Sequence, residues 1–199
     1  MPDEKPTFGD LTEALGGIVV VWGMVEDGVR KLLNTVVLNN EQDKQISGIV
    51  MAESTFRTQL NVLRKAAHVR RPDSDWTKRL DELLREIGDS LHAKRNRYIH
   101  DLWMENGSGV IVKVVRGQEE VAAKRKNGVT QIVWQEPKPA ILEEIWDFFE
   151  RIACVYESLL EMDVEYLHMT VQDAENQAAH KAGGNVIQQL LGGTAKSGD

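Results

Sequence analysis

The chain has one cysteine, no excess of positive charge and no long apolar run, and each of these features excludes some classes of protein. Cys154 cannot form an intrachain disulfide, which suits a reducing cytoplasm. The net charge of −7 argues against general coating of nucleic acid, so any such contact must use a local basic patch. With 199 residues, the chain fits one domain or one domain with a tail.

Targeting and membrane patterns are also missing from the sequence. The most strongly apolar run, around residues 16–25, is shorter than the ~20 residues that span a bilayer. The first residues lack the basic-then-apolar order of a secretory signal. We therefore expect a soluble cytoplasmic protein with no membrane contact.

Several familiar chemical motifs do not occur. The sequence has no glycine-rich phosphate loop, His-Glu-x-x-His pattern, cysteine pair or Gly-x-Ser-x-Gly elbow. His92 and His100 have no third soft ligand at helical spacing, so we expect neither a metal nor a cofactor. Cys154 falls on the apolar side of a predicted helix, and we interpret it as a small core residue.

Apolar residues recur at three- and four-residue steps along most of the chain, which predicts a mainly α fold. The first helix is expected to begin at Asp10, where Glu13 follows in an arrangement close to a capping box. The predicted helices cover about residues 10–38, 41–69, 75–104 and 140–163, and a further helical stretch at 164–182 continues the last one or turns back.

Glycines interrupt the first of these helices at four positions, Gly16, Gly17, Gly23 and Gly28. Each costs ~1 kcal/mol relative to alanine inside a helix. We interpret them as places where a neighbouring helix approaches closely, with a functional kink as the alternative.

Between the third and fourth helices the pattern becomes extended. Residues 110–115 are β-branched, and two further extended segments, 121–126 and 129–134, flank Asn127-Gly128, a strong hairpin signal. We expect a small β-hairpin or meander at about 109–135, inserted before the last long helix. The predicted domain spans 10–165, and 166–199 is a C-terminal helical extension with a flexible tail.

The segment 94–103 carries the chemistry. It concentrates cations, an amide and an imidazole in an otherwise acidic protein, and the apolar stripe of its helix weakens between Leu91 and Tyr98. Such local violations of patterning are expected at functional or strained sites.

Helical geometry limits how this segment can act. At ~100° per residue, Asn96 and His100 lie ~40° apart with His92 in line, whereas Arg95 lies ~140° from His100. One regular helix would not place Arg95 and His100 on the same small ligand. They could meet if the helix were distorted there, or if two copies faced each other across a two-fold axis.

Together these groups could cleave RNA without a metal. An arginine fork can hold a phosphate by two parallel hydrogen bonds, and histidine exchanges protons near neutral pH. RNA supplies its own nucleophile, the 2′-hydroxyl.

Residues 95–100, Arg-Asn-Arg-Tyr-Ile-His, resemble the signature of the HEPN superfamily, the higher eukaryote and prokaryote nucleotide-binding domains. That signature is an arginine, an adjacent polar residue, and a histidine after four to six intervening residues; here four intervene. The stretch 22–26, Trp-Gly-Met-Val-Glu, and the helix-hairpin-helix order also resemble prokaryotic members. The resemblance covers roughly residues 10–165.

The resemblance implies an antiparallel helical bundle that dimerises to bring two motifs together, often as a metal-independent endoribonuclease in toxin–antitoxin or phage-defence systems. By this resemblance, Arg95 would bind the scissile phosphate, Asn96 would orient it or the histidine, and His100 would be the general acid and base. The partners implied are a second copy, RNA or a nucleotide, and an antitoxin or other protein.

Three flanking residues, His92, Lys94 and Arg97, complete the candidate site as groups that raise the local potential for substrate. Many HEPN members have glycine after the histidine, whereas this chain has Asp101, whose carboxylate could stabilise protonated His100 or repel a phosphate. Glu26 could meet the motif as a salt-bridge partner or a site residue. The alternatives are a non-catalytic module that binds a nucleotide, RNA or protein, and a helical dimer whose cluster only fixes the interface.

Overall fold

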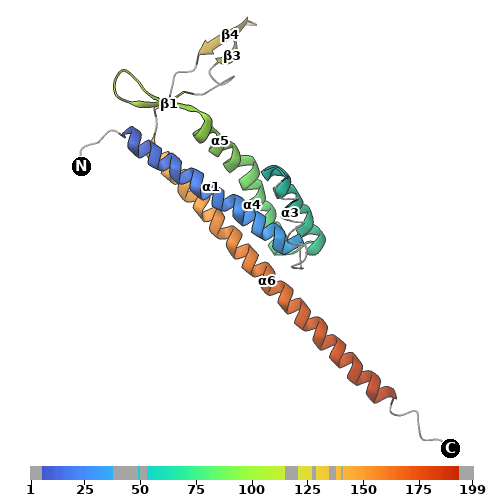
Figure 1. Ribbon diagram of the computed structural model, residues 1–199. Coiled ribbons are helices and arrows are strands. Elements are labelled where there is room, and N and C mark those ends of the chain that lie inside the picture. Colours follow the sequence, from blue (N-terminus) through green and yellow to red (C-terminus); the bar gives the residue numbers. More distant parts are fainter. Residues whose placement is uncertain are drawn as a thin grey trace, which may run out of the picture.

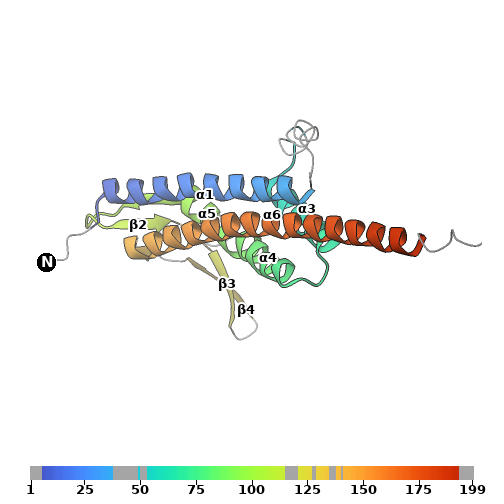
Figure 2. The same cartoon turned by 90° about the horizontal axis from the view of Figure 1, so that it is seen from below.

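In the computed structural model, helix α1 (Phe8–Val37) and helix α6 (Leu142–Gly192) lie side by side and run in the same direction (Figure 1). Gly17 of α1 is next to Phe149 of α6, and Gly28 is next to Leu159, so residue numbers rise together along both helices. Figure 2 shows the same parallel pair from below. The structure describes residues 6–37, 49, 53–114, 121–126, 129–134, 138–139 and 141–192.

A second layer covers this pair. Helix α3 (Phe56–Arg70) lies against α1, and a rod of three segments follows it: α4 (Asp75–Arg85), the π-helix η2 (Glu86–Leu91) and α5 (His92–His100).

The rod runs opposite to α6. At its start Trp76 lies 5.0 Å from Tyr166, between ring centroids, and near its end Tyr98 lies 5.2 Å from Phe148. The mainly α prediction is confirmed. The antiparallel arrangement holds for the rod, but it is wrong for α1 and α6, because the whole rod and the β segment intervene and return the chain to its starting end.

Two small antiparallel sheets connect α5 to α6. One has the order β1-β2-β5, from β1 (Leu102–Glu105), β2 (Ile111–Val114) and β5 (Lys138–Pro139). The other is the hairpin of β3 (Val121–Lys126) and β4 (Val129–Trp134), in which Lys126 pairs with Val129. The predicted hairpin is therefore confirmed, although Asn127-Gly128 itself lies outside the described residues.

The core lies where α1, α3, the rod and α6 meet. Its largest fully buried side chains include two tryptophans, Trp22 and Trp76, and the Trp76 indole donates a hydrogen bond to the backbone carbonyl of Met162 at 3.0 Å. The apolar positions at three- and four-residue steps along α1, Leu11, Leu15, Ile18, Trp22, Val25, Val29, Leu32 and Val36, are buried as predicted, except Leu15, which is half-buried. The buried apolar residues of α1 are Leu11, Ala14, Ile18, Val21, Trp22, Val25, Val29, Leu32, Leu33 and Val36.

Helix ends differ from the predictions for local reasons. Helix α1 begins at Phe8, because Thr7 and Asp10 exchange hydrogen bonds: the Thr7 hydroxyl accepts from the Asp10 N–H at 3.2 Å, and the Asp10 carboxylate accepts from the Thr7 N–H at 2.7 Å. The second predicted helix is interrupted at 53–55, where the Thr55 hydroxyl caps α3. The rest of that segment, 38–48 and 50–52, lies outside the described residues.

Two further predictions need correction. The third helix ends at His100, not at residue 104, because Leu102–Glu105 pairs with β2 instead of continuing the helix. The insert therefore begins before residue 109. Cys154 is exposed, so its interpretation as a core residue is wrong; Ile152 and Val155 take the inward positions beside it.

Helix α6 continues unbroken through the predicted boundary at residue 165, and Figure 1 shows it reaching past the end of the bundle. The region 166–192 is thus a continuation of the last helix and does not turn back.

Helix α1 is long and apolar enough, by length and composition alone, to cross a membrane. The apolar run at residues 16–25 is itself too short for this, so the sequence predicted no membrane-spanning helix. A core helix of a soluble protein passes the same test, and α1 packs one side against α6 and α3.

The four glycines inside α1 beyond its first turn, Gly16, Gly17, Gly23 and Gly28, fall into two pairs. A Cβ at Gly17 would lie 3.2 Å from the Phe149 ring, and one at Gly28 would lie 3.3 Å from Leu159, so close helix approach is confirmed there. Gly16 and Gly23 have nothing within 4 Å, so close approach within the chain does not explain them.

We predict that Gly17→Ala lowers the free energy of unfolding by about 1 kcal/mol, because the methyl group must displace an aromatic ring held against Trp146. The matched change Gly16→Ala, in open space, should raise it by about 0.5–1 kcal/mol through helix propensity. Urea unfolding of both variants measures the difference. Equal effects would show that α6 yields at Gly17 without cost.

Candidate functional site

Arg95 occupies the inward-facing row of α5. It follows the buried Leu91 by four residues and precedes the buried Tyr98 by three, so it stands where the helix would otherwise present an apolar side chain. Its side chain is half-buried, and its Nε is buried without a hydrogen-bond partner. The predicted weakening of the stripe between Leu91 and Tyr98 therefore marks a half-buried guanidinium group.

Neutral groups surround Arg95. Its Nη1 donates a hydrogen bond to Asn96 Oδ1 at 3.0 Å, and its guanidinium carbon lies 6.0 Å from the centroid of the Trp22 ring on α1. Within the described parts of the chain, no carboxylate forms an ion pair with Arg95. A partly desolvated cation without a counter-charge attracts an anion more strongly than an exposed arginine does.

Trp22, the first residue of the stretch 22–26 that resembles prokaryotic HEPN members, is a fully buried core residue and is also the contact that joins α1 to this site. Its ring lies 5.8 Å from that of His92, and its indole N–H donates to Glu26 Oε1 at 2.8 Å. Glu26 is therefore linked to the site through Trp22: its hydrogen bond is to the Trp22 indole and not to Arg95. The sequence could have indicated this contact, because Glu26 follows Trp22 by four residues, so the two side chains lie on one face of the helix.

His92 is half-buried in an aromatic cluster. Its ring lies 5.8 Å from Trp22 and 6.0 Å from Phe56 of α3, so it ties α5 to both neighbouring helices. Lys94 projects to the other side of α5, where its ammonium lies 4.8 Å from the centroid of the Phe148 ring on α6. The structure thus does not bring Lys94 together with Arg95, although both were predicted to face substrate.

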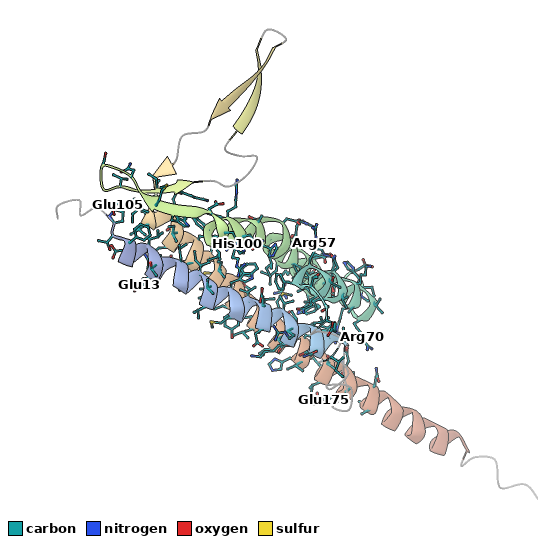
Figure 3. All side chains as sticks on the ribbon, turned by 45° about the horizontal axis from the view of Figure 1, so that its top comes forward. Glu13, Arg57, Arg70, His100, Glu105 and Glu175 are labelled. Carbon is teal, nitrogen blue, oxygen red and sulfur yellow. The ribbon has the colours of Figure 1, made fainter. Side chains whose placement is uncertain are left out.

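His100 is the last residue of α5 and is exposed. It makes no hydrogen bond or ion pair to any other described residue. Figure 3 shows His100 where α5 meets the β segment. Arg97, on the same helix, is exposed as well.

The chain turns sharply directly after His100, and this turn fixes the end of α5. The Trp103 indole donates to the Tyr98 carbonyl at 3.0 Å, satisfying an otherwise orphan acceptor of the last helical turn. The rings of Tyr98 and Trp103 stack with an interplanar angle of 7°. The backbone position of His100 is therefore fixed by strand β1 as well as by its own helix.

Asp101 pairs with another residue and not with His100. Its carboxylate forms an ion pair with Lys113 of β2 at 2.8 Å, and the two side chains are only 10% and 21% exposed. The negative charge introduced at this position is thus offset within the same protomer.

Arg95 and His100 do not converge within one chain. The irregular segment η2 covers Glu86–Leu91 and ends before Arg95, whereas α5 is a regular α-helix from His92 to His100. The ~140° separation expected for a regular helix therefore remains. Of the two ways in which the pair could meet, a distortion between them is excluded for the isolated chain.

A groove between α4 and α6 offers no alternative phosphate site. Four glutamates line it, and its arginine, Arg79, is already paired with Glu165 by two hydrogen bonds. No group of three or more metal-binding side chains is found among the residues that the structure describes.

Comparisons with protein-family models, curated proteins and solved structures find no match to this chain.

The pKa of Tyr98 allows a test of the packing at the end of α5. Burial, and then the nearby Glu144 carboxylate, raise the pKa of Tyr98. Because the folded pKa lies above the unfolded value of ~10, this group's contribution to stability is complete below ~pH 10 and is lost as pH rises through the folded pKa. We predict that the free energy of unfolding falls more steeply above ~pH 10 in the wild type than in Tyr98→Phe. Equal slopes in urea titrations would contradict this.

Proposed function

We propose that the protein is a cytoplasmic, RNA-cleaving homodimer of the HEPN type that acts without a metal, in a toxin–antitoxin or phage-defence setting. The observation that carries the proposal is Arg95, a partly buried guanidinium with an orphan Nε and no acidic partner among the described residues. A buried donor left unpaired costs about 1–3 kcal/mol, which an arriving phosphate oxygen would recover. A purely structural arginine would be expected to hold a carboxylate.

The arrangement around Arg95 suits a phosphodiester. Asn96 accepts from Arg95 and so holds the guanidinium plane, while its amide N–H groups remain donors for a second phosphate oxygen. Trp22 limits the guanidinium to one side of α5. His92 supports this assembly by packing, so its predicted role in raising the local potential for substrate becomes secondary. Arg97 keeps that role.

In the proposed reaction the ribose 2′-hydroxyl attacks the adjacent phosphorus. His100 of one copy accepts the hydroxyl proton, the bond between phosphorus and the 5′-oxygen breaks, and the same His100 returns the proton to the leaving oxygen through a water molecule. The products are a 2′,3′-cyclic phosphate and a 5′-hydroxyl. Arg95 would stabilise the negative charge that develops on the phosphorane oxygens.

Asp101, the departure from the family pattern, is compatible with this chemistry. Its pairing with Lys113 leaves little net charge beside His100. The phosphate would therefore meet a locally neutral corner and not an isolated carboxylate.

One observation favours the alternative, a non-catalytic module that binds a nucleotide, RNA or protein partner. Arg95 alone can bind an anion in a single chain, whereas cleavage needs His100 from a second copy because the two side chains do not converge on one helix. Binding without cleavage is therefore the expected behaviour of any form that stays monomeric.

We predict that Arg95→Ala and His100→Ala each reduce cleavage of mixed RNA at least ~100-fold with chelator present. Arg95→Lys keeps the charge but loses the fork, so its activity should be intermediate. The matched control is His168→Ala, which removes an exposed histidine of α6 far along the chain from the motif and should leave activity unchanged. Intact RNA in the wild-type reaction, with binding retained, would favour the binding module.

A mixed dimer tests whether the site is shared. Coexpressed Arg95→Ala and His100→Ala chains, purified through two different tags, carry one intact Arg95 and one intact His100 on opposite subunits. Cleavage should return in the mixed dimer although both parent dimers are inactive. Failure to recover would indicate that each chain must carry both groups.

A further inference from the structure

The outer face of α1, opposite its buried face, is apolar and contacts no other element in the part of the chain that the structure describes. From Ala14 to Val25 the helix contains no charged residue. Val20 is 65% exposed, Val19 is 45% exposed and Met24 is 40% exposed, whereas core valines of the same helix are fully buried. A helix that is apolar all round is expected to be covered all round.

Gly16 and Gly23 lie on this same face. Unlike Gly17 and Gly28, which accommodate α6, they have nothing within 4 Å. The helix therefore carries open, side-chain-free positions on either side of the exposed Val20, a surface on which another backbone could come close.

Opposite charges lie at the two ends of this apolar face. Glu13 stands one turn before Gly16, and Arg30 stands two turns after Gly23; both are exposed. Neither forms an ion pair with another described residue. Figure 3 shows Glu13 on the side of α1 that faces away from α5. Glu13, Gly16, Val20, Gly23, Asp27 and Arg30 form one row at alternating three- and four-residue steps.

We propose that this row packs antiparallel against the same row of a second copy. A two-fold axis between Val20 and Gly23 places Val20 of each chain against Gly23 of the other, so that the open glycine receives the exposed valine. The same axis brings Glu13 opposite Arg30 of the second copy, and it does so twice, because a two-fold interface is self-complementary. Charge complementarity thus selects both the partner and its direction.

The level of this axis coincides with the candidate site. Trp22 lies between Val20 and Gly23 in sequence and points inward, where it contacts Arg95 and His92. In an antiparallel pair related by a two-fold axis, helices that flank α1 on one side lie on the same side of the dimer. Both α5 helices would therefore border one groove above the α1 pair.

The flank of α5 that carries His92, Asn96 and His100 lies away from α6, because Tyr98 and Lys94 take the α6 side, and its first residue, His92, contacts Trp22 of α1. Two such flanks would face each other across the groove. This last step rests on the proposed function; the self-association itself does not.

Two other readings of the exposed apolar residues are weaker. The apolar part of the face, from Gly16 to Met24, is ~12 Å long, which is short against a hydrocarbon core of ~30 Å, and charges bound it at both ends. A second exposed row on α6, at Leu160, Val164, Leu167 and Val171, lies among the acidic side chains Glu157, Glu161 and Glu165, which would repel their copies.

The test is the solution mass of the full chain by light scattering and sedimentation. The wild type should be a dimer, and Val20→Glu should be a monomer with unchanged helix content, because the side chain is exposed. The matched control Val164→Glu, at a valine 51% exposed on α6, should remain a dimer. Glu13→Arg and Arg30→Glu should each weaken dimerisation about tenfold at low salt, and the double variant should restore it.

The outcomes separate the proposals. A monomeric wild type, or a dimer lost in Val164→Glu and kept in Val20→Glu, would overturn this interface. So would flotation of the wild type, but not of Val20→Glu, with phosphatidylcholine–phosphatidylglycerol vesicles. A wild-type dimer that responds to the charge swap as expected but leaves RNA intact supports the interface and contradicts the nuclease.

Discussion

The contact between the Trp22 indole and the Arg95 guanidinium joins the two halves of this protein. One partner comes from α1 and the other from α5, more than 70 positions later in the printed sequence. Because Arg95 stands in the inward row of its helix, its charge must lie against α1 or leave a void. An aromatic face can accept a cation there without neutralising it, so the fold keeps a positive charge half-buried and available.

The structure around that contact follows from how α1 is used. Its α6 side is closed by close approach at Gly17 and Gly28, and its α5 side is filled by Trp22 and its neighbours. In the part of the chain that the structure describes, only the outer side remains open. One helix thus supplies the core, the support for the candidate site and the surface proposed for self-association; under that proposal, the site would depend on how two copies meet.

The α5–β1 corner shows how the chain holds an exposed histidine in place. The regular helix ends at His100. The following strand is then held by the hydrogen bond from the Trp103 indole to the Tyr98 carbonyl and by the ion pair of Asp101 with Lys113. The histidine itself contributes nothing to this fastening. A side chain that is positioned by its neighbours but free of partners among the described residues is suited to proton transfer, since moving its proton does not disturb the fold.

Local patterns in the sequence determined the mainly α class, the inward stripe of α1, and the hairpin of β3 and β4, and the weakened stripe of its helix drew attention to residues 94–103, because these features depend on neighbouring residues. Tertiary structure decided that α1 and α6 run parallel, that Gly17 and Gly28 meet α6 while Gly16 and Gly23 do not, and that Trp22 lies beside Arg95. It also decided that Lys94 turns to α6 and Asp101 to Lys113. Local spacing determines on which side of its own helix a residue lies, but only packing determines which groups it contacts there.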